Sequence, residues 1–130
     1  MNSNYYLEFE NKFRGDRDSI IKNFSSYDPL IELVIKHLDN PKFIDIGCGR
    51  GEWLERWYNK VPNCWGIEND KKMAEFCRSK DLNIIEGEAI DSLKEISSNS
   101  ISVITIFHMI EHLEYLELIT LLKECHRVLN

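Results

Sequence analysis

The sequence lacks the features that mark membrane and secreted proteins. Its longest apolar run, ISVITIFHMI (101–110), is too short and too interrupted to cross a bilayer. The opening residues MNSN do not begin a secretory signal. The four cysteines contain no C-x-x-C pair, which excludes the common zinc spacings, and they are too sparse for a disulfide framework: Cys48, Cys64, Cys77 and Cys125. We therefore predict a cytoplasmic protein without a metal site.

Basic residues are also in the minority. There are 16 Lys and Arg residues against 22 Asp and Glu, which gives a formal net charge of −6. This balance disfavours nonspecific binding to nucleic acid or anionic lipid and favours a small-molecule partner. The length of 130 residues suits one domain, and its three Trp, five Tyr and six Phe disfavour intrinsic disorder.

From Pro41 onward, short apolar runs alternate with longer amphipathic runs. The short runs predict strands over 42–46, 64–68, 82–87 and 101–107. The longer runs predict helices over 51–60, 69–80, 88–96 and 112–130. Two helices are predicted before the sheet, over 5–15 and 28–38. Because the strands are almost continuously apolar, the alternation predicts an α/β fold with a parallel sheet covered on both faces.

A glycine-rich turn, DIGCGRG (45–51), separates the first predicted strand from the helix that follows it. Parallel sheets bind ligands at the carboxyl ends of their strands, and glycines there let the backbone approach a ligand closely. Glu68 ends the second strand about 20 residues after Gly47, where a carboxylate can accept hydrogen bonds from ribose hydroxyls. The pattern therefore indicates a nucleoside-containing cofactor.

Two familiar nucleotide motifs are absent from this turn. The glycines follow G-x-G-x-G rather than G-x-G-x-x-G, so the third glycine of the dinucleotide fingerprint is missing. No G-K-[ST] follows, which excludes a Walker loop. A nucleotide-binding oxidoreductase domain stays open as the weaker alternative.

Four segments resemble the motifs of class I S-adenosylmethionine (SAM) dependent methyltransferases, in the same order. They are FIDIGCGRGEW (43–53), GIEND (66–70), EGEAIDSL (86–93) and ISVITIFHMIEHL (101–113). The resemblance implies a Rossmann-like sheet of strand order 3-2-1-4 and SAM as the cofactor. We also expect an N-terminal helical lid segment over 1–40 and a SAM-binding half-domain over 41–130. A noncatalytic SAM-binding or pairing module is the alternative.

The resemblance assigns a cofactor-binding set to Asp45, Gly47, Cys48, Gly49, Gly51, Glu68, Asn69, Glu88, Ala89 and Phe107. Asp45 would help to hold the methionine amino group, and the glycines would pass beneath the methionine moiety. Glu68 would bind the ribose, and Asn69 would flank the adenine. Glu88 and Ala89 would meet the adenine edge.

The N-terminal segment YYLEFENKFRGDRDSI (5–20) is similar to the opening of bacterial O-antigen chain-terminator methyltransferases. This resemblance implies lipopolysaccharide biosynthesis, with methyl transfer to an oxygen of a terminal sugar or phosphate. Our hypothesis is that Tyr5, Tyr6, Arg14 and Arg17 form a lid whose arginines bind an anionic acceptor. For the tyrosines, simple packing of the helix is the alternative. His108 would lie close to the transferred methyl group, and His108 or His112 is the candidate base for a hydroxyl acceptor.

The last residues, HRVLN, end the last predicted helix. In the family resembled, a fifth strand follows directly after this helix. With strand order 3-2-1-4, the predicted strand 101–107 lies at the edge of the sheet. A long apolar edge is a template for pairing with another chain. We therefore expect either a truncated product or a protein that pairs through this edge, as a homodimer or with a partner chain.

Overall fold

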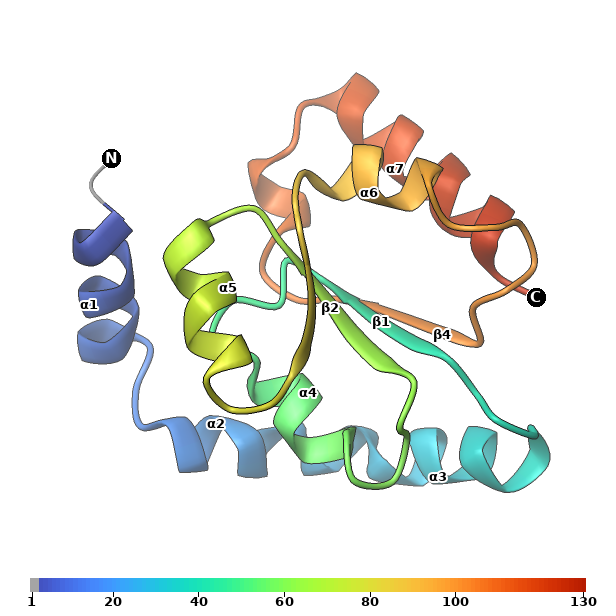
Figure 1. Ribbon diagram of the computed structural model, residues 1–130, viewed down its shortest axis with the longest axis horizontal. Coiled ribbons are helices and arrows are strands. Elements are labelled where there is room, and N and C mark those ends of the chain that lie inside the picture. The colour runs from blue at the N-terminus through green and yellow to red at the C-terminus, as the bar shows by residue number, and fades with distance from the viewer. Residues whose placement is uncertain (1–2) are drawn as a thin grey trace.

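The computed structural model describes residues 3–130, except for the side chains of Ser3, Asn4 and Tyr6. Within that range, four parallel strands form one sheet in the order β3-β2-β1-β4. Their bounds are β1 (Phe43–Ile46), β2 (Cys64–Glu68), β3 (Asn83–Glu86) and β4 (Val103–Ile106). Helices lie on both faces of this sheet (Figure 1). The predicted α/β fold and strand order are confirmed.

The helices alternate with the strands as the sequence pattern predicts. After β1 they are α4 (Glu52–Trp57), α5 (Lys71–Arg78), α6 (Ala89–Lys94), the 3-10 helix η2 (Ile110–His112) and α7 (Tyr115–Val128). α7 begins later than predicted, because Glu114 and Glu117 form a capping box around its first turn. In the described chain no helix is long and apolar enough to span a membrane.

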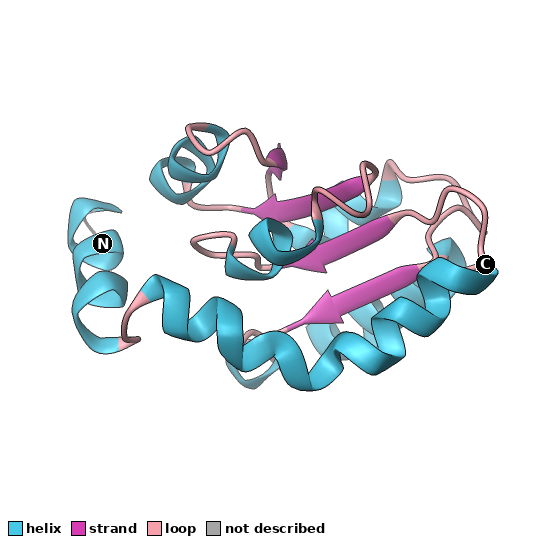
Figure 2. Cartoon of the chain, turned by 90° about the horizontal axis from the view of Figure 1, so that it is seen from below, coloured by secondary structure: helices cyan, strands magenta, loops and turns pink. Residues whose placement is uncertain are grey.

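Three helices and a 3-10 turn precede the sheet. They are α1 (Ser3–Phe13), α2 (Arg17–Asn23), η1 (Phe24–Tyr27) and α3 (Asp28–His37). α2 is absent from the sequence prediction. Its N-cap is Asp16, whose side chain accepts a hydrogen bond from the Ser19 amide. α2 and α3 run along one side of the strands (Figure 2), whereas α1 stands beyond the sheet next to α5 (Figure 1).

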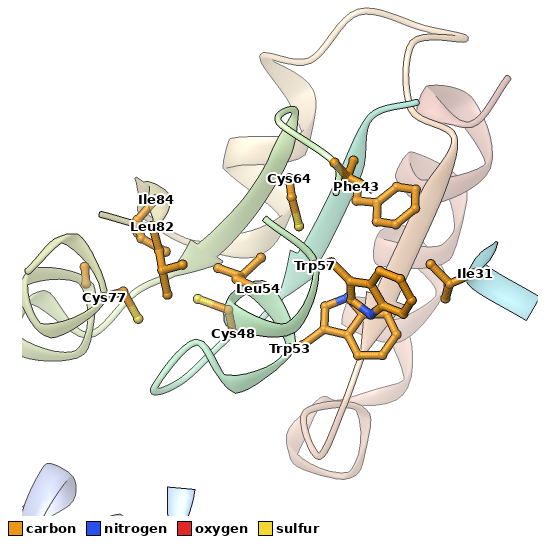
Figure 3. Packing of buried hydrophobic residues seen from close by; sticks show 12 residues of the cluster. Ile31, Phe43, Cys48, Trp53, Leu54, Trp57, Cys64, Cys77, Leu82 and Ile84 are labelled. Atoms are coloured by element: carbon orange, nitrogen blue, oxygen red, sulfur yellow. The ribbon is translucent and has the colours of Figure 1, made fainter. Parts of the chain in front are cut away.

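The core consists of two clusters of buried side chains, one on each face of the sheet. On one face, Trp53 and Trp57 of α4 pack in the same cluster as Phe43 of β1 (Figure 3). On the other face, Ile44 and Ile46 of β1 pack with side chains of α6 and α7. Successive strand residues point to opposite faces, so β1 contributes to both clusters.

β4 lies at the edge of the described sheet, as predicted. Its only strand partner among the described residues is β1. Just before β4, Ile101 forms an isolated parallel bridge with Leu129. Pairing of this edge with a second chain stays a prediction.

The glycine turn packs directly onto the backbone of β2 at Gly66. A Cβ atom placed on Gly66 would lie 2.5 Å from Sγ of Cys48 and 2.7 Å from Cδ1 of Leu54. Both distances are shorter than any van der Waals contact, so no larger residue fits without displacing the turn or α4.

We predict that Gly66→Ala lowers the free energy of unfolding by about 1–3 kcal/mol, because the added methyl group overpacks this contact. Urea denaturation followed by circular dichroism measures the effect. A companion Cys48→Ala substitution, which removes the nearest atom, should recover part of the loss. A Gly66→Ala protein as stable as wild type would show that the turn does not pack tightly on β2.

Candidate functional site

A cavity of about 500 Å³ opens where the four strands end. Each strand contributes to the cavity lining through its last residues or through the residues that directly follow the strand. The predicted site residues in its lining are Arg14, Gly47, Gly49, Glu68, Asn69, Glu88, Ala89, Phe107 and His108. Carboxyl ends of parallel strands converge in this way at the point where strand order reverses, here between β1 and β4.

Three members of the predicted set lie beneath the cavity rather than in its lining. Asp45 is buried within β1, where its carboxylate accepts a hydrogen bond of 2.7 Å from the Thr105 hydroxyl. Cys48 is buried under the turn, and Gly51 begins α4 in the left-handed conformation at φ 76°. The Tyr6 side chain lies outside the described residues.

Glu68 is held rigidly at the end of β2. One carboxylate oxygen accepts a 2.9 Å hydrogen bond from the Gly49 amide, and the other accepts a 2.9 Å bond from the Asp70 amide. Burial raises the pKa of Glu68, although these two backbone hydrogen bonds oppose the shift. Nearby, the Asn69 amide donates to Glu88 over 3.2 Å and links the ends of β2 and β3.

Four amides of the glycine turn, those of Gly47, Cys48, Gly49 and Gly51, donate within the protein. The amides of Gly47 and Cys48 both donate to the Ile67 carbonyl, over 2.9 and 3.2 Å. The Gly51 amide donates to the Cys48 carbonyl over 2.9 Å. The first turn of α4 also carries two acids, Glu52 and Glu55. This turn therefore differs from a phosphate-binding loop, whose free amides and helix dipole attract an anion.

Arg50, a residue that the sequence analysis did not single out, is the charged centre of the turn. Its side chain is only 3% exposed and donates to the equally buried Glu52 over 2.7 Å. It also donates to the Asn11 side chain over 2.9 Å and to the Gly15 carbonyl over 3.4 Å. A charge inside a glycine turn, two residues before an acid, was the available sequence signal.

Arg17, the first residue of α2, also contacts the glycine turn. Its guanidinium donates to the Arg50 carbonyl and forms an ion pair with Glu55. It does not line the cavity, because these partners hold it against the turn and α4. This placement does not support the hypothesis that Arg17 binds the acceptor, which stays a prediction.

His108 stands exposed where β4 ends. Its backbone is left-handed, with φ 53°, a conformation that non-glycine residues adopt rarely and often at functional sites. Its Nδ1 lies 3.9 Å from a carboxylate oxygen of Glu111. The preceding Phe107 packs against Trp53 and Phe24, with ring centroids 5.2 and 4.8 Å apart. These aromatic contacts fix the backbone that presents His108.

A family model described as a methyltransferase domain matches residues 44–130. The chain belongs to this family. It is a class I SAM-dependent methyltransferase domain. No curated protein matches the sequence.

Solved structures of similar fold place the domain in context. A SAM-dependent methyltransferase from Archaeoglobus fulgidus is 32% identical, with a TM-score of 0.82 over 97% of this chain and 54% of its own. PH0226 from Pyrococcus horikoshii is 22% identical, with a TM-score of 0.66 over 84% of this chain and 52% of its own. YcgJ from Bacillus subtilis is 23% identical, with a TM-score of 0.59 over 76% of this chain and 45% of its own. The chain thus spans about half the length of these solved relatives.

We predict that Arg50→Met lowers the free energy of unfolding by about 3–5 kcal/mol, because it leaves the Glu52 carboxylate buried without its partner. Urea denaturation measures the change. The double variant Arg50→Met/Glu52→Met should be more stable than Arg50→Met alone. Lys60→Met serves as the control, since the Lys60–Glu32 pair is exposed and contributes less than about 1 kcal/mol. Equal losses in Arg50→Met and Lys60→Met would contradict this account.

Asp45 makes the stability of the domain depend on pH. Burial raises the pKa of Asp45 to about 7, and the charges of Glu52 and Glu68 add to the effect. The Thr105 hydrogen bond and the Arg14 charge oppose it. Because the unfolded carboxyl titrates near 3.8, the folded state binds more protons between these values. This contribution to stability is therefore fully present below pH 4 and is lost as pH rises through about 7.

We predict that Asp45→Asn removes this loss of stability with rising pH, because the amide stays uncharged and its oxygen still accepts a hydrogen bond from the Thr105 hydroxyl. Urea denaturation at a series of pH values between 5 and 8 compares the variant with wild type. The stability difference should move in favour of the variant as pH rises. Parallel pH profiles for the two proteins would mean that Asp45 does not titrate in this range.

Proposed function

We propose that this domain binds SAM in the cavity and transfers its methyl group to an oxygen acceptor. The observation that carries the proposal is the Glu68 carboxylate, fixed by two backbone amides at the cavity wall beside the glycine turn. Each of its oxygens keeps a further lone pair, which can accept from the ribose hydroxyls. Asn69, Glu88 and Ala89 follow β2 and β3 and would contact the adenine.

The charge of the cavity suits this cofactor. Four carboxylates line it: Glu10, Glu68, Asp70 and Glu88. SAM carries a sulfonium and an ammonium against a single carboxylate, so its net charge is positive and an acidic cavity attracts it. A dinucleotide is disfavoured, because four of the turn amides donate within the protein and α4 begins with acids. The oxidoreductase alternative is therefore the weaker one.

The catalytic residues would act mainly by positioning. Bound SAM would supply an electrophilic methyl group, and the residues of the cavity would hold a methyl acceptor in line with the bond between that group and sulfur. The turn residues Gly47 and Gly49 would pass beneath the methionine moiety, with Phe107 backbone beside it. His108 would take the proton of a hydroxyl acceptor. A phosphate or carboxylate acceptor is already ionised and needs no base.

We propose further that residues 1–40 act as a lid segment. Glu10 and Arg14 of this segment reach the cavity lining, and Asn11 is bound to Arg50 of the turn. The similarity of 5–20 to O-antigen chain-terminator enzymes supports a bacterial surface glycan as the acceptor and lipopolysaccharide biosynthesis in the cytoplasm as the setting. The glycan acceptor rests on that similarity alone.

We predict that S-adenosylhomocysteine binds the domain saturably and that Glu68→Gln weakens the binding at least tenfold, since the amide replaces an ionised acceptor at the ribose. Isothermal titration calorimetry measures both proteins. Glu86→Gln is the matched control, because Glu86 pairs with Glu68 in register on β3 but lies outside the cavity lining. No binding by folded wild type would reject the cofactor proposal. An equal loss in Glu86→Gln would reject the role of Glu68.

A further inference from the structure

Helix α1 turns an aromatic face away from the protein. Tyr5, Phe9 and Phe13 follow one another at intervals of four residues and so lie along one face of the helix. Their side chains are 62%, 45% and 65% exposed. Glu10 and Arg14 lie on a different face of α1, which lines the cavity. A helix docked on a domain usually buries its apolar face, so the orientation of α1 is the reverse of the usual one.

The three rings form one continuous stripe. The ring centroids of Tyr5 and Phe9 are 6.4 Å apart, and those of Phe9 and Phe13 are 4.7 Å apart. α1 stands at one end of the molecule beside α5, with no other element of the described chain beyond it (Figures 1 and 2). Another molecule can therefore reach this stripe. Contiguous exposed apolar side chains of this kind mark interaction surfaces.

The charges beside the stripe indicate which molecule fits it. Glu8 and Lys12, both exposed and also four residues apart, lie along one edge of the stripe. The Lys12 ammonium lies 5.4 Å from the centroid of the Phe13 ring. One edge of the stripe therefore carries a negative charge followed by a positive charge one helical turn later.

This arrangement is complementary to itself. A two-fold axis at Phe9, perpendicular to the helix, places Phe9 against the partner's Phe9 and Tyr5 against the partner's Phe13. The same rotation brings the charged edge of each helix against the same edge of the other helix, in reverse order. Glu8 then lies alongside the partner's Lys12, within the reach of these long side chains, and opposite charges meet twice.

We propose that α1 is a dimerisation surface, on which the aromatic stripes of two copies of this chain pack antiparallel. This surface is separate from the edge strand β4, and the inference does not rest on the proposed function. Because α1 also presents Glu10 and Arg14 to the cavity, the packing would hold this helix beside the cavity in both subunits.

The size of the stripe sets the strength of the dimer. Aromatic side chains bury roughly 150–250 Å² each when fully covered, and these three are already partly covered in the monomer. The contact therefore stays below the roughly 1,200 Å² of a standard interface. We expect a dimer that dissociates on dilution, with a dissociation constant on the order of 10–100 µM.

The first test removes the central ring. Sedimentation velocity, over about 5 to 500 µM protein, compares wild type with Phe9→Ser and Leu30→Ser. Leu30 is the matched control, because it is an equally apolar side chain, 63% exposed, on α3. Wild type and Leu30→Ser should form the same dimer, and Phe9→Ser should weaken it at least about tenfold. A wild type that stays monomeric throughout would overturn the proposal. Equal dimerisation of wild type and Phe9→Ser would overturn it in favour of another surface, such as the β4 edge.

The second test exchanges the charges. Lys12→Glu puts like charges opposite each other and should weaken the dimer several-fold. The double variant Glu8→Lys/Lys12→Glu should restore it, because the pairs form again with their signs exchanged. Both positions are exposed, and far-UV circular dichroism should show an unchanged fold. A double variant that dimerises as weakly as Lys12→Glu would overturn the antiparallel packing of α1.

Discussion

The cavity depends on the way in which the glycine turn is bonded to β2. The Ile67 carbonyl accepts from two successive turn amides, and the neighbouring Glu68 carboxylate accepts from a third. Gly66, just before them, admits Cys48 to within contact of the backbone. These contacts hold the turn against the end of β2 by hydrogen bonds and close packing. The carboxylate that we propose for the ribose is thereby fixed before any ligand arrives, which reduces the entropy lost on binding.

The buried arginine of the turn connects this rigid part to the N-terminal helices. A charged pair taken out of water costs free energy unless hydrogen bonds satisfy its remaining donors. Arg50 meets that condition by bonding Glu52, Asn11 and the Gly15 carbonyl. The same contacts dock α1 beside the cavity. The hydrogen bonds that replace water around Arg50 are therefore the same ones that position the proposed lid.

Charge is distributed unevenly around the site. Carboxylates dominate its lining, and a further acid, Asp45, is buried below it. Burial and the charges of Glu52 and Glu68 raise the pKa of Asp45, and a cationic ligand would relieve that repulsion. Among the described residues of the lining, Arg14 is the only arginine or lysine, and its guanidinium lies close to Gly49 of the turn. The acidic lining thus favours a positively charged ligand such as the cofactor.

The sequence by itself determined the parts of the molecule that depend on local pattern. The apolar runs located all four strands, and the glycine turn with Glu68 at its spacing located two walls of the cavity, because strand period and turn chemistry are properties of neighbouring residues. Only the tertiary structure decided the partners of Arg17 and Arg50. The Arg17–Glu55 and Arg50–Asn11 contacts join residues 38 and 39 positions apart. No periodic pattern encodes such contacts, because they form only when α1 and α2 dock against the turn.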